Sequence, residues 1–218
     1  MKAFEAWLAT TPHPVTLFVI TDLFESEEFG EWFNALLAKH GERLTVGCHG
    51  LTHRSWSAWP EDGEGFEASL KQATAVLKEK AGGHFRPWFR APAGYIAPWM
   101  ATTLAGQGYT VDSSVNPSWL VRKKAGKGNS WADVNDAMAQ QGVLERPWAT
   151  RFSLPVNGPA LTKFPLSVIA RGVWKKAPSV LTGSELDAAV PDSTQPLVTL
   201  YWHVLDHSRN KATWTPPL

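Results

Sequence analysis

The sequence predicts an α/β fold in which a parallel sheet is wrapped by helices. Apolar runs of strand length alternate with segments of helical periodicity, and the runs are continuous, as in strands that are buried on both faces. The chain has 218 residues, of which 44% are hydrophobic and 19% are charged. This length and composition predict a single globular domain over residues 1–218.

The first half of the chain shows the alternation clearly. Helical periodicity covers 3–10, about 26–39, 64–80 and 96–106, and apolar strand-like runs cover 15–20, 44–48, 88–89 and 109–111. Asp22, three residues before Glu25, predicts a capping box for the helix over 26–39. A strand, helix, strand, helix order of this kind is typical of a parallel sheet.

The second half has weaker patterns. The polar, glycine-containing segment 123–128 predicts a mobile loop. We expect a short helix over 133–141, edge strands over 143–145 and 152–156, a serine-capped helix over 184–190, and a last buried strand over 197–203.

Polar residues stand at the ends of four apolar runs. These residues are His49, Arg90, Asp112 and His203. Because the carboxyl ends of parallel strands meet at one edge of a sheet, we expect them to converge there. His53 follows His49 by four residues, and two imidazoles at this spacing can reach one metal ion if the chain turns after the strand.

Each of these residues also has a structural interpretation when it is taken alone. An isolated pair of histidines is more often part of a surface loop, Arg90 could form a buried ion pair, and Asp112 could belong to a turn. His203 could be a hydrogen-bonded core histidine. Their shared position at strand ends favours the functional interpretation.

Composition excludes several classes of protein. The net charge of +1 gives no electrostatic argument for nucleic acid or an anionic membrane as a partner. Cys48 is the single cysteine, which excludes an intrachain disulfide and a cysteine-rich zinc site. The longest apolar runs are strand-length, so neither a membrane span nor a signal peptide is predicted. This favours the cytoplasm, although a preceding export signal would leave the location open.

The chain has 12 tryptophans, and a cleft lined with aromatic rings is one use for so many. We expect the tryptophans beside the polar strand ends to line such a cleft. They are Trp56, Trp59, Trp119 and Trp202.

Four segments together resemble the polysaccharide deacetylase family, the NodB-homology domains. They are HGLTH (49–53), FRAPAGY (89–95), VDSSVNPSW (111–119) and LYWH (200–203). Each segment is a weak signal alone, but four in the family's order are specific. The resemblance covers nearly the whole chain and implies an irregular (β/α) barrel of about seven parallel strands.

The resemblance also implies a reaction, which is metal-dependent removal of N-acetyl groups from a sugar polymer. A divalent ion, usually zinc, polarises the acetyl carbonyl and activates a water. By resemblance, His49 and His53 bind the metal and His203 protonates the leaving amine, with Asp112 orienting it. Arg90 would contact the carboxylate of the general base. The chain near Tyr95 would line the oxyanion site, with Trp119 and Trp202 beside the substrate.

The sequence departs from the family at its start. The family opens with a strand that carries two adjacent aspartates, and no Asp-Asp pair occurs in these residues. We therefore expect the first strand to be missing, the metal occupancy to be low and the activity to be weak. The run at 15–20 would lose a neighbour, and an open apolar edge of this kind predicts self-association.

Four interpretations remain open at this stage. The chain could be a truncated deacetylase, a non-catalytic protein that binds carbohydrate, or a structural remnant of the fold. Alternatively, another carboxylate could complete the metal site, and Asp22 is the nearest candidate because it also follows a strand.

Overall fold

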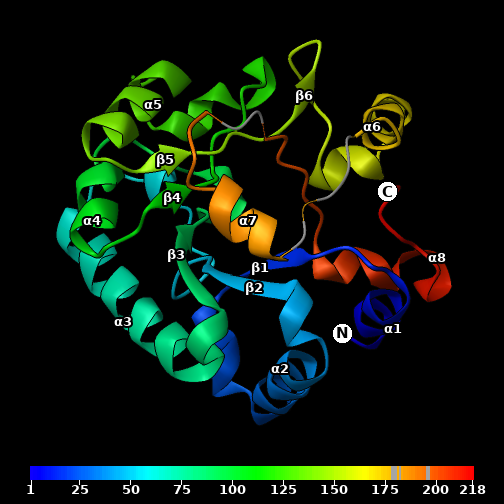
Figure 1. Cartoon of the computed structure of the whole chain (residues 1–218). Helices are drawn as coiled ribbons and strands as arrows, with labels where there is room; N and C mark the ends of the chain where they lie inside the picture. Colours follow the sequence, from blue (N-terminus) through cyan, green and yellow to red (C-terminus); the bar gives the residue numbers. More distant parts are fainter. Residues whose placement is uncertain (178–180, 182, 195–196) are drawn as a thin grey trace.

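The α/β prediction is confirmed by the computed structural model, which describes residues 1–177, 181, 183–194 and 197–218 (Figure 1). Five parallel strands form one sheet in the order β1-β2-β3-β4-β5. Their bounds are Val15–Val19, Leu44–Cys48, Phe85–Phe89, Val111–Asp112 and Leu144–Glu145.

Helices cover the outside of this sheet, as Figure 1 shows. They are α1 (Lys2–Thr10), α2 (Glu27–His40), α3 (Gly63–Ala81), α4 (Met100–Gly106) and α5 (Trp131–Gln140). Helices α2 to α5 each connect two consecutive strands, which is the connection that a parallel sheet requires. Side chains such as Val46, Phe66 and Phe89 fill the layer between sheet and helices and are at most 2% exposed.

The predicted cap of α2 is wrong. Asp22 lies in a short 3₁₀ helix, η1 (Thr21–Glu25), and Ser26 caps α2 by accepting a hydrogen bond from the Phe29 N–H at 3.3 Å. The 3₁₀ turn separates Asp22 from the helix start, whereas Ser26 directly precedes it.

The predicted start of α4 and the predicted loop at 123–128 also change. Helix α4 begins at Met100, because the Ile96 N–H donates to the Lys124 carbonyl instead of opening the helix. Residues up to Ala125 form a 3₁₀ helix, η6 (Trp119–Ala125). The Lys124 carbonyl also accepts the Ser57 hydroxyl at 2.7 Å, so the polar segment is anchored to its neighbours.

The second half adds smaller elements. They are the antiparallel hairpin β6 (Thr150–Arg151) and β7 (Leu154–Pro155), with α6 (Leu166–Trp174), α7 (Gly183–Ala189) and α8 (Arg209–Ala212). Helix α6 was not predicted and packs in a second core cluster around Val156, Leu161 and Trp214. The predicted helix over 184–190 is confirmed as α7, but the predicted cap at Ser184 lies outside the described side chains.

Helix α7 packs on the sheet face opposite the outer helices, and Figure 1 shows it in front of β3. Its Leu186 belongs to a cluster with Trp88 and Val111. Asp187 accepts two hydrogen bonds from Arg86, at 2.8 and 2.7 Å, near the start of β3. Helix α7 therefore packs on the inner side of the curved sheet.

The predicted last strand over 197–203 is wrong as a regular strand. This segment is extended, but it forms a single parallel bridge, between Thr199 and Trp148. Its other backbone bonds go to a loop, where Tyr201 N–H donates to Asn157 Oδ1 and Gly158 N–H donates to the Tyr201 carbonyl. Among the described strands, β1 pairs with β2 alone, so these residues form a curved five-stranded parallel sheet with β1 at one edge.

No helix in the described part of the chain is long and apolar enough to span a membrane.

Candidate active site

The residues after strands β2 to β5 form one row at the carboxyl edge of the sheet. The backbone ladder continues one step past the strands, because the N–H groups of His49, Arg90, Ser113 and Arg146 each donate to the preceding strand at 2.8–2.9 Å. His49 and Arg90 therefore converge as the sequence predicted. Asp112 lies one step earlier in the ladder, inside β4.

His49 has a fixed tautomer. Its Nδ1 lies 2.6 Å from the Arg90 carbonyl oxygen, and a carbonyl can only accept, so Nδ1 carries the hydrogen and Nε2 keeps its lone pair. Burial lowers the pKa of His49 to about 3, against the effect of this hydrogen bond, and the charges of Arg90, His53 and His203 lower it further. The imidazole is therefore neutral near pH 7 and has a free nitrogen.

His53 lies beside His49 as the four-residue spacing predicted. The ring centroids are 5.4 Å apart, with an interplanar angle of 69°. His53 is exposed, whereas His49 is partly buried at the strand end. The pair can offer two imidazole nitrogens to one ligand.

Arg90 is held by Ser113 and by aromatic rings. Its Nε donates to the Ser113 carbonyl at 2.9 Å and its Nη2 to Ser113 Oγ at 3.0 Å. The guanidinium lies 4.3 Å from the Phe18 ring centroid and 5.2 Å from that of Tyr201. Burial lowers the pKa of Arg90 to about 10, so the side chain remains charged at neutral pH.

Asp112 does not reach the edge that carries His49. It is fully buried and is the register partner of Phe89, whose ring lies in the helix-facing core. Register partners share a face of the sheet, so the Asp112 carboxylate points toward the helices. There it accepts hydrogen bonds from the Ser114 hydroxyl at 2.6 Å and the Ser114 N–H at 3.2 Å.

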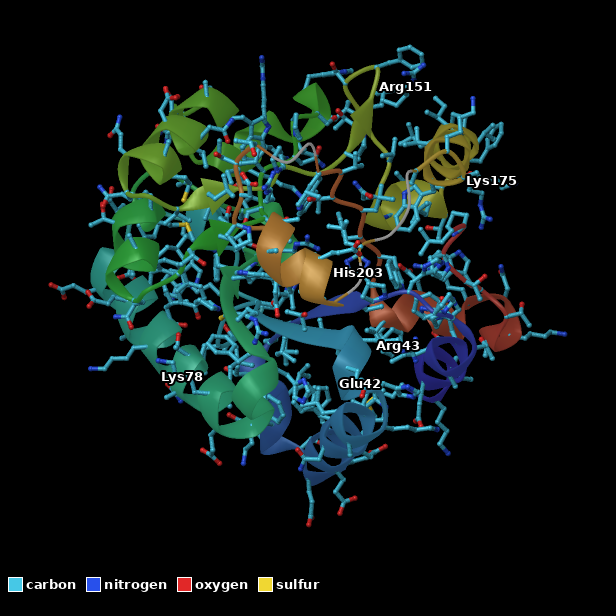
Figure 2. All side chains as sticks on the ribbon, viewed as in Figure 1. Glu42, Arg43, Lys78, Arg151, Lys175 and His203 are labelled. Carbon is cyan, nitrogen blue, oxygen red and sulfur yellow. The ribbon has the colours of Figure 1, made fainter. Side chains whose placement is uncertain are left out.

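The carboxylate beside His203 belongs to Asp206, not to Asp112. Asp206 Oδ2 lies 3.4 Å from His203 Nδ1 and accepts the His203 N–H at 3.0 Å. Burial opposes ionisation of Asp206, but the Arg209 guanidinium at 2.7 Å, the His203 N–H and the charges of both residues lower its pKa overall. The His203 side chain, labelled in Figure 2, is 57% exposed, and its ring stands edge-on to Tyr201 with centroids 5.7 Å apart.

The aromatic residues that the sequence assigned to the substrate take three different positions. Trp119 is 62% exposed on η6. Tyr95 is partly buried, and its backbone N–H donates to the Pro92 carbonyl at 3.1 Å, so this N–H is occupied and does not offer an oxyanion contact. Trp202 packs away from the site, because its indole Nε1 donates to His207 Nε2 at 2.8 Å in an aromatic cluster.

The two remaining tryptophans that were expected to line a cleft also differ. Trp56 is 6% exposed and packs edge-on against Phe66 in the main core. Trp59 is 64% exposed. Of the four tryptophans, Trp59 and Trp119 are therefore the ones that solvent can reach freely.

The donor set for a metal ion is incomplete within this structure. In the ranges described here, no group of three His, Cys, Asp or Glu side chains lies close enough to hold a metal ion. Asp22 therefore does not complete a site with His49 and His53. Catalytic zinc usually takes three protein ligands and a water, so the two imidazoles fit as part of such a site and not as the whole of it.

Sequence reasoning missed Glu145, Asp206 and Tyr201. Glu145 ends an apolar run just as His49 does, so the same signal could have identified it. Asp206 follows His203 by three residues, which is a capping spacing. Tyr201 and His203 alternate with Trp202 in an extended segment, and the period of two places them on one side.

Comparison with known proteins gives a family match over half of the chain. The family model described as polysaccharide deacetylase matches residues 2–111. A Mycobacterium smegmatis protein described as a candidate polysaccharide deacetylase has a similar structure, with a TM-score of 0.54 and 18% identity. The match covers 97% of this chain and 65% of that one, so the chain spans about two thirds of the length of that relative.

A second solved structure, IcaB from Ammonifex degensii, has a TM-score of 0.46 and 21% identity, with coverage of 69% of this chain and 62% of that one. No curated protein matches this sequence.

Proposed function

This chain belongs to the polysaccharide deacetylase family, and from this premise we propose that it is a metal-dependent hydrolase that removes N-acetyl groups from a polysaccharide or a related sugar amide. The single observation that supports this best is the arrangement of His49. Its Nδ1 hydrogen is committed to the Arg90 carbonyl, which leaves Nε2 unprotonated beside His53 at the carboxyl edge of a parallel sheet. Such an edge is where α/β enzymes place their ligands.

His49 and His53 would hold the proposed metal, which we expect to be zinc. When bound, a divalent ion polarises the acetyl carbonyl and activates a water. The hydrogen bond from His49 Nδ1 to the Arg90 carbonyl is the kind of contact that orients a ligating imidazole and increases its basicity. The remaining ligands of the ion would come from water or from groups other than those described.

His203 is the proposed donor of a proton to the leaving amine. It is exposed, its Nδ1 lies 3.4 Å from Asp206 Oδ2, and its ring also accepts a hydrogen bond from the Asp206 N–H, so Nε2 is the ring nitrogen that remains available to exchange a proton with substrate. Asp206 is suited to this because its lowered pKa keeps it ionised at neutral pH. Arg90 contributes by holding Ser113 and, through its carbonyl, His49.

The test is release of amine groups from an N-acetylglucosamine oligomer by purified protein, with and without added zinc. His203→Asn and Asp206→Asn should each lower kcat by about 100-fold, within the usual range for loss of a general acid. His13→Asn, a histidine before β1 and far from this row in sequence, should leave the rate unchanged. Turnover that is indifferent to His203→Asn, or that persists in His49→Ala with zinc, would contradict the assignment.

The alternative function is carbohydrate binding without cleavage, and the two-histidine donor set favours it. A binding protein would bind the oligomer without releasing amine, and His203→Asn would not alter the affinity. The same experiment therefore separates the two functions.

A further inference from the structure

A pair of buried carboxyl groups lies directly behind the row that carries Arg90 and Ser113. Asp112 and Glu145 are register partners on β4 and β5. Asp112 is fully buried, and although Glu145 is partly exposed as a residue, its carboxyl oxygen Oε2 is buried. The proposed reaction gives neither side chain a role.

One proton shared by the pair accounts for the surroundings of Glu145. If Glu145 were ionised, its buried Oε2 would have no hydrogen-bond partner in the described structure, whereas a protonated carboxyl can donate to Asp112. Burial, followed by the charge and the hydrogen bond of Asp112, raises the pKa of Glu145 well above its usual value. Burial also raises the pKa of Asp112, against hydrogen bonds from Glu145 and Ser114. Two adjacent buried carboxyl groups cannot both ionise at low cost, so they titrate as one unit.

Arg90 is a charged neighbour of the pair. Its positive charge lowers the pKa of Asp112, and both carboxyl groups raise the pKa of Arg90. A singly protonated pair carries one negative charge, which Arg90 balances. A second ionisation would add an unbalanced buried charge.

The pair fixes the loop that follows β4. Asp112 accepts both the hydroxyl and the N–H of Ser114, at 2.6 and 3.2 Å, and Glu145 Oε1 accepts the Val115 N–H at 3.2 Å. Ser114 Oγ in turn accepts the Ala91 N–H at 2.8 Å. This links the pair to the residue next to Arg90.

Ser113 directly precedes the anchored residues Ser114 and Val115, and it forms hydrogen bonds with Arg90, Trp148 and Arg146. Its carbonyl accepts hydrogen bonds from Arg90 Nε at 2.9 Å and from Trp148 Nε1 at 2.7 Å, and its hydroxyl donates to the Arg146 carbonyl at 2.9 Å. The Arg90 carbonyl then accepts the Nδ1 hydrogen of His49. Hydrogen bonds, linked by the backbone of Ser113 and Ser114 and by Arg90, therefore connect the carboxyl pair to the imidazole.

We infer that the buried Asp112–Glu145 pair is a positioning element, which holds the Ser113–Val115 loop and thereby fixes Arg90 and the tautomer of His49. Loss of the shared proton at alkaline pH loosens the loop and releases the His49 hydrogen bond. The activity part of this inference rests on the proposed function, whereas the positioning part does not.

Two spectroscopic measurements on the full chain test the positioning directly. Infrared difference spectra should show the carbonyl stretch of a protonated carboxyl at neutral pH in the wild type, and Glu145→Gln should remove it. Glutamine keeps an N–H donor toward Asp112 and a carbonyl acceptor for Val115, without a titratable proton. Proton–nitrogen NMR of the His49 ring should show the Nδ1–H tautomer in both proteins at neutral pH.

Raising the pH then distinguishes the wild type from Glu145→Gln. The wild type should lose the His49 Nδ1–H signal at the pH where the pair gives up its proton. In Glu145→Gln the signal should persist to a pH that is higher by about one unit or more, and one pH unit corresponds to a tenfold change in proton concentration. Ser114→Ala, which removes one anchor but no titrating group, should broaden the signal already at neutral pH. Glu42→Gln exchanges an exposed glutamate, labelled in Figure 2, and should behave as the wild type.

The inference is overturned if the wild type lacks the protonated-carboxyl band at neutral pH, or if wild type and Glu145→Gln lose the His49 signal at the same pH. These readouts need no substrate. A protein that shows both expected spectra but no deacetylation would refute the proposed function and leave the positioning element standing. Deacetylation without the expected spectra would refute the positioning element and leave the proposed function standing.

Discussion

Gly158 and Tyr201 are in direct contact, and this contact holds the segment that carries His203. The Gly158 N–H donates to the Tyr201 carbonyl at 3.0 Å, and a Cβ atom at position 158 would lie 2.7 Å from the Tyr201 hydroxyl oxygen. Gly158 also has a φ of +51°, which favours glycine. A side chain at this position is therefore excluded by both space and backbone conformation.

Gly158→Ala should lower the free energy of unfolding by about 1–3 kcal/mol, because the overlap forces the Tyr201 ring or the loop to move. Since the Tyr201 ring touches the His203 ring, the same change should lower the rate of any reaction that uses His203. Urea denaturation of both proteins measures the first effect. Gly172→Ala is the matched control, because Gly172 lies in α6 with nothing within 4 Å, and it should stabilise the protein by about 0.5–1 kcal/mol. Equal effects at the two positions would contradict this account.

His207 should make the protein less stable in acid. Burial lowers the pKa of His207 to about 4 from 6.5, with Asp206 opposing the shift and the amino terminus adding to it. The unfolded state therefore binds more protons than the folded state between these values, and stability falls as the pH drops from about 6.5 to about 4. The full loss is about 3 kcal/mol for one such group.

His207→Gln should remove this part of the pH dependence, although it also loses contacts with the surrounding aromatic rings. Unfolding free energies measured at several pH values give the slope, and His13→Gln serves as the control. A slope that persists in His207→Gln would show that another group causes the acid instability.

Zinc binding should depend on His49 and be reversible by a chelator. Two imidazoles leave the coordination of the ion incomplete, so we expect weak binding, and His49→Ala should weaken it further by about tenfold or more. His49 has its pKa lowered to about 3 and stays unprotonated at mildly acidic pH. Protonation of His49 therefore does not weaken zinc binding near pH 6.5, whereas protonation of a histidine with an unshifted pKa would weaken it at this pH. Calorimetric titration with zinc measures this, and tight binding by His49→Ala would refute it.

Trp119 should contribute to glycan affinity without contributing to stability. Its indole is 62% exposed, so a sugar ring can pack on it at little cost in protein packing. Trp119→Ala should weaken binding of an N-acetylglucosamine oligomer by about 1 kcal/mol, which is about fivefold in Kd. Leu120→Ala changes the next residue, 43% exposed, and should have no effect on affinity. Tryptophan fluorescence titration compares the two variants.

The open edge of β1 should support self-association. In the described sheet, β1 has a strand on one side alone, and its Val15, Leu17 and Val19 side chains are buried. An apolar edge with unpaired backbone groups can pair with another chain. Sedimentation velocity at increasing protein concentration should show a growing dimer or larger species. A single monomeric species at every concentration would contradict this prediction.

The sequence by itself determined the α/β class and the first four strands of the sheet. The run 44–48 is buried at every position, as its continuous apolar composition predicts, whereas the run 15–20 alternates buried and half-buried side chains and so buries one face more fully than the other. The sequence also predicted that His49 and His53 lie together, because His49 directly follows a buried strand and the spacing to the next histidine is short.

The tertiary structure alone decided which carboxylate meets which partner. Asp112 and Glu145 share a register across two strands, and no local pattern specifies a register between segments far apart in the sequence. It also decided that Trp202 packs against His207 while Tyr201 and His203 face the site, since the side of an extended segment that becomes buried depends on what packs against it. The pKa values of His49, Asp112 and Glu145 follow from the same cause, because burial and neighbouring charges exist only once the chain has folded.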